Sequence, residues 1–363
     1  MKTIKFGISE ISDKGPCYVI AEIGHNHQGN LKVALDMIKV AAQSGVNAIK
    51  FQKRSNKGLY TKKMYNKPYD NEDSFGLTYG EHREFLEFDF DEFTALKKCA
   101  GENNLEFMCT AFDFESVDFL EKLGITSYKV ASGDLTNIHL LEYIARLNKP
   151  IFLSTGASTL DEVRMAYEAI LKHHNKLCLL HTVCSYPTEY SDLNLKVIET
   201  LKKEFPEAII GYSGHDNGIL AAVIAYMLGA TVLEKHFTIN RSWKGTDHKF
   251  SLEPEGLRKQ VRDLRRVDIS LGSGKKLASD IEKNAKVKMA KSIYTNKALS
   301  KGDILKRDDI CIKSPGEGLP PYYIDKVINK RLKTDLPEES LILPEFLENE
   351  KSEKKAVIHS KKS

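Results

Sequence analysis

Short apolar runs alternate with longer amphipathic segments from residue 17 to about residue 270. The short runs are typical of buried strands, and the longer segments repeat apolar residues at helical spacing. Strands are expected at residues 18–22, 48–52, 106–110, 127–131, 151–155, 177–182, 208–212 and 231–234. Helices are expected at 31–44, 91–103, 115–123, 137–147, 159–173, 193–204, 217–228 and 254–271. This repetition over about 250 residues predicts an α/β fold of the (β/α)8 TIM-barrel type.

The pattern changes near residue 289. Strand-like pieces at 292–294, 304–305, 310–312 and 341–343 are separated by turns rich in glycine and proline. We expect a barrel domain at 1–272, a linker at 273–288, a small β-rich domain at 289–349 and a disordered tail at 350–363. So small a domain holds little core, and is expected to pack on the barrel or on a partner chain.

Polar residues gather where the expected strands end, which is where barrel enzymes carry their active groups. Serine and threonine are common there because they cap the next helix. Two lysines, two histidines and several carboxylates are not explained in that way. Lys50 and Lys129, with the hydroxyl groups of Thr110, Ser132, Ser154 and Ser213, suit a small ligand that carries a phosphate and a carboxylate.

Two histidines are expected at the same rim of the barrel. His215 and His236 follow neighbouring parallel strands, and Asp247 lies in a glycine-containing loop beyond them. Two imidazoles and a carboxylate suit a divalent metal ion that keeps open positions for substrate.

Residues 53–88 are too many for a plain loop between a strand and a helix. The segment carries Lys53, Arg54, Lys57, Lys62, Lys63 and Lys67. It is either a lid whose basic residues meet an anionic substrate or a solvated surface.

Composition narrows the class of protein. The net charge is only +4, from 54 basic and 50 acidic residues, which does not indicate nucleic-acid binding. No signal peptide or membrane span is recognisable, so a cytoplasmic protein is expected. The six cysteines form no CxxC pair, and reduced thiols are expected.

Seven short motifs together resemble the sialic acid synthase family. They are AEIGHNH at 21–27, KFQ at 50–52, YKVASGD at 128–134, LSTG at 153–156, YPT at 186–188, GYSGH at 211–215 and EKHF at 234–237. The resemblance covers about residues 4–347 and implies a barrel followed by an antifreeze-like (SAF, β-clip) domain. Among the branches of this family, the segments 78–82, 243–248 and 251–254 most resemble the N-acylneuraminate-9-phosphate synthases.

The resemblance implies a transferase that condenses phosphoenolpyruvate with N-acetylmannosamine or its 6-phosphate, giving N-acetylneuraminate or its 9-phosphate and free phosphate. His215 and His236 match metal ligands, for Mn²⁺, Mg²⁺ or Co²⁺. The phosphoenolpyruvate contacts are matched by Lys50, Thr110, Lys129, Ser132, Ser154 and Ser213, and the sugar contacts by Glu22, Gln52, Tyr186 and Asp247. The catalytic residues are then Lys129 and a general base, either Glu22 or Asp134.

The resemblance further implies a domain-swapped homodimer. Many bacterial members carry an arginine from the small domain that reaches the sugar site of the partner subunit, and Ser314 occupies that position here. Three other functions stay open: a legionaminic or pseudaminic acid synthase acting on a 6-deoxy diamino sugar, a Schiff-base aldolase using Lys129, and a non-catalytic sugar-binding protein.

Overall fold

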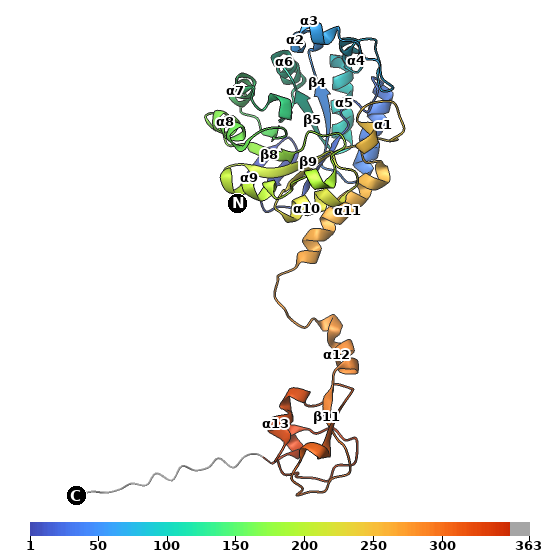
Figure 1. Cartoon of the computed structure of the whole chain (residues 1–363), viewed down its shortest axis with the longest axis vertical. Helices are drawn as coiled ribbons and strands as arrows, with labels where there is room; N and C mark the ends of the chain where they lie inside the picture. Colours follow the sequence, from blue (N-terminus) through green and yellow to red (C-terminus); the bar gives the residue numbers. More distant parts are fainter. Residues whose placement is uncertain (349–363) are drawn as a thin grey trace, which may run out of the picture. The chain divides into compact units, whose positions relative to one another are not determined.

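A computed structural model describes residues 1–348, which divide into two compact units. The first unit is Met1–Gly272, and the second begins at Ser273. Figure 1 shows the first unit as a ring of helices around a core of strands. The disordered tail predicted at 350–363 lies outside the described residues.

Eight parallel strands close into a barrel in the order β10-β3-β4-β5-β6-β7-β8-β9. The strands are β3 (Tyr18–Glu22), β4 (Ala48–Lys53), β5 (Glu106–Ala111), β6 (Tyr128–Val130), β7 (Ile151–Ser154), β8 (Leu177–Thr182), β9 (Ile209–Gly214) and β10 (Val232–His236). The predicted barrel is therefore confirmed, with every expected strand in place.

The expected helices cover the outside of the barrel (Figure 1). They are α1 (Leu31–Gln43), α5 (Phe90–Glu102), α6 (Phe114–Leu123), α7 (Ile138–Arg146), α8 (Leu160–Leu171), α9 (Val197–Glu204), α10 (Leu220–Met227) and α11 (Pro254–Leu271). Side chains such as those of Asn30, Asp89 and Thr159 accept backbone N–H bonds at the helix starts. The helix expected at 193–204 begins late, at Val197, because Asn194 has a left-handed backbone with φ of +42°.

The interior of the barrel changes from apolar to polar along each strand. Inward residues such as Tyr18, Ile20 and Phe152 form a buried cluster with a hairpin that the sequence did not predict, β1 (Thr3–Phe6) and β2 (Ser9–Ser12). Because strand side chains alternate, the next inward position after Ile20 is Glu22. The hairpin therefore fills the N-terminal end of the barrel, and polar groups fill the C-terminal end.

The insertion at residues 53–88 is packed rather than extended. It contains α2 (Asn56–Leu59), α3 (Lys62–Tyr65) and α4 (Tyr79–Phe85), and Thr78 and Glu81 form a capping box at the start of α4. The ring of Tyr79 contacts the rings of Tyr60 and Tyr69, with 5.1 and 5.4 Å between centroids. The segment is thus a small folded layer rather than a loose solvated loop.

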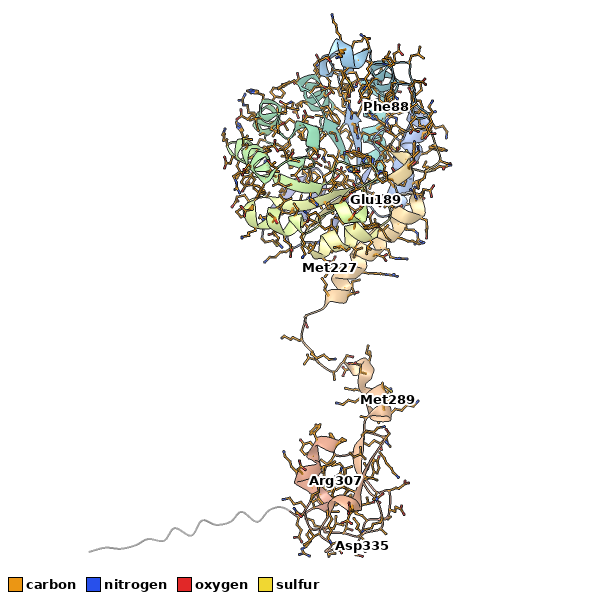
Figure 2. All side chains as sticks on the ribbon, in the orientation of Figure 1. Phe88, Glu189, Met227, Met289, Arg307 and Asp335 are labelled. Atoms are coloured by element: carbon orange, nitrogen blue, oxygen red, sulfur yellow. The ribbon has the colours of Figure 1, made fainter. Side chains whose placement is uncertain are left out.

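The second unit has its own small buried cluster. The helices and strands of this unit include α12 (Lys283–Met289), β11 (Ser292–Thr295), β12 (Ile310–Lys313) and α13 (Ile324–Val327). Arg307 and Asp335 are labelled in this unit in Figure 2. The antiparallel pair β11–β12 packs with residues such as Ile293, Leu305 and Ile342. The strands expected at 304–305 and 341–343 are wrong, because these residues form only isolated bridges. In residues 1–348 no helix is long and apolar enough to cross a membrane.

Candidate active site

A cavity of about 640 Å³ opens at the C-terminal end of the barrel strands. The alternation of side chains along each strand explains which residues line the cavity, because most lining residues lie two or four positions after an inward apolar residue. The predicted site residues that line it are Glu22, Lys50, Gln52, Thr110, Lys129, Ser132, Ser154, Tyr186, Ser213, His215, His236 and Asp247. The structure therefore brings together every predicted site residue except Asp134.

The floor of the cavity is a buried network around Lys50. Its Nζ lies 2.8 Å from Oε2 of Glu22 and 3.6 Å from Oε1 of Glu234, and it donates to Oγ1 of Thr110 at 2.9 Å. Burial would lower the pKa of Lys50, but Glu22 and Glu234 raise it, so the ammonium group stays charged. Burial, reinforced by Glu234 and opposed by Lys50, raises the pKa of Glu22 to about 7.

Lys129 is the second cation of the floor. It donates to Oγ of Ser154 at 2.6 Å and to the carbonyl oxygen of Val130 at 2.9 Å. Burial lowers its pKa to about 8; Lys50 acts in the same direction and Glu234 opposes it. Ser213 donates to Oε1 of Glu234 at 3.0 Å, so this carboxylate contacts Lys50 and a hydroxyl group and acts electrostatically on Lys129. Glu234, which had no predicted role, is therefore part of the site.

The two candidates for the general base lie in different places. Glu22 is buried in the cavity, between Lys50 and the amide of Gln52, which donates to Oε1 of Glu22 at 2.7 Å. Asp134 lies just after β6, where Oδ1 accepts from Nδ2 of Asn137 at 3.3 Å, and it does not line the cavity. Its neighbour Ser132 does line it, and accepts from the N–H of Gly156 at 3.0 Å.

The imidazoles of His215 and His236 are neighbours at the rim. Their centroids are 5.4 Å apart, and the ring of Tyr186 lies 4.2 Å from that of His215. Burial, together with His236, lowers the pKa of His215 to about 4, and burial also lowers the pKa of His236. Both rings are neutral at pH 7 and can act as metal ligands.

The donor set fits a divalent metal ion in part. Nδ1 of His215 lies 2.8 Å from the carbonyl oxygen of Val183, which places its proton there and leaves Nε2 free to bind. Nδ1 of His236 is buried without a hydrogen-bond partner, 3.8 Å from Oδ2 of Asp247. Within residues 1–348 no three His, Cys, Asp or Glu residues are grouped to hold a metal. His215, His236 and Asp247 nevertheless all line the cavity, so the metal site predicted from these residues stays a prediction.

Two arginines in the cavity wall were not assigned a role from the sequence. Arg54, which follows β4, and Arg83, on α4, both line the cavity. Arg54 was included only among the basic residues of the insertion, and Arg83 directly follows the recognised segment 78–82. The other polar or reactive lining residues without a prediction are Asp73, Thr182, Cys184, Thr246 and Lys249.

Comparison with known proteins identifies the family. The model of the NeuB family matches residues 37–276, and that of the SAF domain matches residues 290–348. The chain belongs to the NeuB family. Human N-acetylneuraminate-9-phosphate synthase is 37% identical over 340 residues, 93% of this chain and 95% of that protein. The sialic acid synthase resemblance is thereby confirmed.

Other NeuB-family relatives differ in their named products. An N,N'-diacetyllegionaminic acid synthase from Legionella pneumophila is 35% identical over 348 residues, 94% of this chain and 98% of that protein. The crystal structure of an N-acetylneuraminic acid synthetase from Leptospira borgpetersenii, in complex with citrate, has a TM-score of 0.67 and 34% identity. It covers 78% of this chain and 96% of that chain. Identity alone therefore does not distinguish between acceptor sugars.

Proposed function

We propose that this NeuB-family protein joins phosphoenolpyruvate to N-acetylmannosamine or its 6-phosphate and releases phosphate. The observation that supports this most is the buried pair Lys50 and Lys129, which lie among hydroxyl groups beside two neutral imidazoles. Phosphoenolpyruvate carries a phosphate and a carboxylate, and two fixed ammonium groups with hydroxyl donors match both. The neutral rings suit a metal ion beside the acceptor.

In the proposed reaction, the methylene carbon of phosphoenolpyruvate attacks the aldehyde carbon of the open-chain sugar and a C–C bond forms. Water adds to the carbon that carries the phosphate, the C–O bond to phosphate breaks, and phosphate leaves with the electron pair. Lys50 and Lys129 hold the two anionic groups throughout. Both are buried in the cavity floor, where the exclusion of bulk water strengthens their attraction for anions.

Glu22 is the proposed base for the attacking water. Its pKa is raised to about 7 by burial, with Glu234 adding to the shift, and a base with a pKa near the working pH is effective. Lys50 and Gln52 fix both carboxylate oxygens at 2.8 and 2.7 Å. Asp134 is outside the cavity wall and is not favoured.

His215 and His236 are proposed to hold a divalent ion, Mn²⁺, Mg²⁺ or Co²⁺, which when bound would polarise the acceptor carbonyl. The carbonyl of Val183 orients the His215 ring, and Tyr186 packs against it. Alanine at either histidine is expected to abolish turnover without lowering the melting temperature of the barrel by more than a few degrees. Near-normal turnover in both variants would contradict the assignment.

The function is tested by measuring phosphate release from phosphoenolpyruvate with Mn²⁺, using N-acetylmannosamine and its 6-phosphate in parallel. A nine-carbon keto acid must form in a one-to-one ratio with phosphate. Failure of both acceptors would overturn the proposed substrates. Trapping of a pyruvate adduct on Lys129 by borohydride would instead show a Schiff-base aldolase.

A second candidate is a legionaminic or pseudaminic acid synthase with the same chemistry. It is favoured by the legionaminic acid synthase relatives, whose identities are close to that of the human protein. Their named products imply an acceptor that is a 6-deoxy diamino sugar. Turnover of a 2,4-diacetamido-6-deoxy hexose at a higher kcat/KM than either mannosamine would establish this candidate.

The SAF domain is proposed to act in a domain-swapped homodimer. In the second unit Ser314 accepts from Nζ of Lys291 at 2.6 Å, and replaces the arginine that many bacterial relatives are expected to carry. Light scattering at working concentration is expected to give twice the chain mass of 41.0 kDa. A fully active monomer would exclude the swap.

A further inference from the structure

Arg54 and Arg83, which line the cavity, converge on one imidazole, that of His25. Nη1 of Arg54 lies 3.2 Å from Nε2 of His25, and Nη1 of Arg83 lies 3.2 Å from Nδ1 of the same ring. Arg54 comes from the end of β4, and Arg83 is aimed into the cavity by α4. Two guanidinium groups thus approach a single side chain from opposite edges.

His25 cannot accept from both arginines. Burial, with Arg54 and Arg83 next in effect, holds the pKa of His25 well below its usual value, so the ring is neutral. A neutral imidazole has one nitrogen that accepts and one that carries a proton. One guanidinium N–H therefore faces an N–H of His25 and needs an acceptor elsewhere.

The other partners of the two arginines are neutral. Arg54 donates to Oε1 of Gln52 at 2.7 Å and its guanidinium carbon lies 3.7 Å from the ring centroid of Phe112. Arg83 donates through Nε to the hydroxyl of Tyr79 at 3.1 Å. In the part of the chain that the structure describes, no carboxylate oxygen lies within 4.0 Å of either guanidinium. Buried cations are normally paired, whereas the buried Arg54 and the half-buried Arg83 have no ion pair among the described residues.

The other basic residues of the insertion do not share this position. Lys53 is paired with Glu87 at 2.9 Å, and Lys62, Lys63 and Lys67 are exposed outside the cavity. Arg54 also lies on the acceptor side, because the amide of Gln52 links it to Glu22, and Arg83 contacts the same histidine as Arg54. Within residues 1–348, neither guanidinium hydrogen-bonds to any of the six residues assigned to phosphoenolpyruvate.

We propose that Arg54 and Arg83 bind the phosphate group of a sugar phosphate acceptor. A guanidinium group presents a planar set of donors that matches two oxygens of a phosphate, and two of them neutralise a dianion. This inference rests on the proposed function, since it selects the 6-phosphate over the free sugar. A 6-deoxy acceptor carries no group that would use this pair.

Kinetics with the two acceptors test the proposal in the full-length protein. Wild type is expected to turn over N-acetylmannosamine 6-phosphate with a higher kcat/KM than the free sugar. Arg83→Gln is expected to raise KM for the phosphorylated acceptor by about 10- to 100-fold, the usual effect of losing a charged hydrogen-bond donor. KM for the free sugar and for phosphoenolpyruvate is expected to change by less than about threefold. Arg83→Lys keeps the charge and is expected to recover part of the loss.

Two further variants separate binding from folding. Arg54→Lys keeps the charge but loses the planar donors, and a smaller rise in the same KM is expected. Lys62→Gln removes a positive charge from the same segment but outside the cavity, and is the matched control that leaves both acceptors unchanged. Thermal melting of each variant identifies any that are merely unfolded.

Some outcomes would overturn the proposal and leave the function intact. Equal losses with both acceptors in Arg83→Gln would mean that the arginines only support the insertion. A wild-type preference for the free sugar would have the same consequence. If neither acceptor reacts, the proposed function fails, and the site is judged by calorimetric titration with N-acetylmannosamine 6-phosphate. Binding that Arg83→Gln weakens would support the site, and no binding by wild type would overturn it.

Discussion

Two pairs of cations line the same cavity, but their surroundings differ. Lys50 forms ion pairs with the buried carboxylates Glu22 and Glu234, which also act electrostatically on Lys129. Among the described residues, by contrast, no carboxylate oxygen lies within 4.0 Å of the guanidinium groups of Arg54 and Arg83, which both contact the neutral ring of His25. The floor with the lysines therefore combines two cations with two carboxyl groups. The wall with the arginines carries an excess of positive charge.

This difference separates two tasks. A network of paired charges holds the buried lysines in fixed positions, and can pass a proton between groups of perturbed pKa. An unbalanced pair gains most when an anion arrives, because no internal partner has to be displaced. The lysine floor is thus suited to the reaction itself, and the arginine wall to selecting an anionic acceptor.

The largest expected effect comes from removing a member of the balanced pair. Lys50→Ala leaves Glu22 and Glu234 without their ammonium partner, which is expected to cost about 3–5 kcal/mol of unfolding free energy. Turnover of phosphoenolpyruvate should fall by about 10³-fold or more with either acceptor. Denaturant unfolding and phosphate release measure the two losses. The exposed Lys57→Ala serves as the control.

Glu22→Gln tests whether the floor supplies the base. The amide keeps the size of the side chain but cannot take a proton, so kcat should fall by about 10²- to 10⁴-fold. The KM for the acceptor should change much less, because Gln52 still has an oxygen to donate to. A variant with nearly normal kcat would show that another group accepts the proton.

The sequence predicted the pair of lysines in the cavity but not the pair of arginines. Lys50, Lys129 and the histidines follow short apolar runs, and the barrel rule places such residues at one rim. Arg54 was placed with five exposed or paired lysines because composition does not show which side chain turns inward. Arg83 belongs to the helix α4 within an insertion. Its direction depends on the packing of that helix on other segments, for example Tyr79 on Tyr60 and His82 on Tyr69.

The errors in the fold have similar causes. The N-terminal hairpin was not recognised because Thr3–Phe6 and Ser9–Ser12 are short and bury only alternate residues. Ile304 pairs with Arg331, and Leu341 pairs with Tyr294, each through a single bridge to a residue distant in the sequence. Local patterns predict elements with a long apolar face, and long-range pairing decides the rest.

Lys129→Arg examines the lysine floor through its pH dependence. The pKa of Lys129 is lowered to about 8 by burial, so the wild-type ammonium is lost as pH rises through that value. The kcat/KM for phosphoenolpyruvate should therefore decline above about pH 8, and the decline should move to higher pH in the arginine variant. The folded protein disfavours the charged lysine, so wild type should also gain stability between pH 8 and 10.5. An identical alkaline limb in both proteins would assign the decline to another group.

Asp134→Asn is expected to have the smallest effect and limits how far the charged network extends. Asp134 lines neither the lysine floor nor the arginine wall. Its carboxylate accepts a hydrogen bond from Asn137, and the amide oxygen of an asparagine can still accept that bond. Turnover with either acceptor should stay within about threefold of wild type, and the unfolding free energy within about 1 kcal/mol. Burial raises the pKa of Asp134 above its usual value. A loss as large as that of Glu22→Gln would instead place Asp134 in the reaction and show that the cavity rearranges when substrates bind.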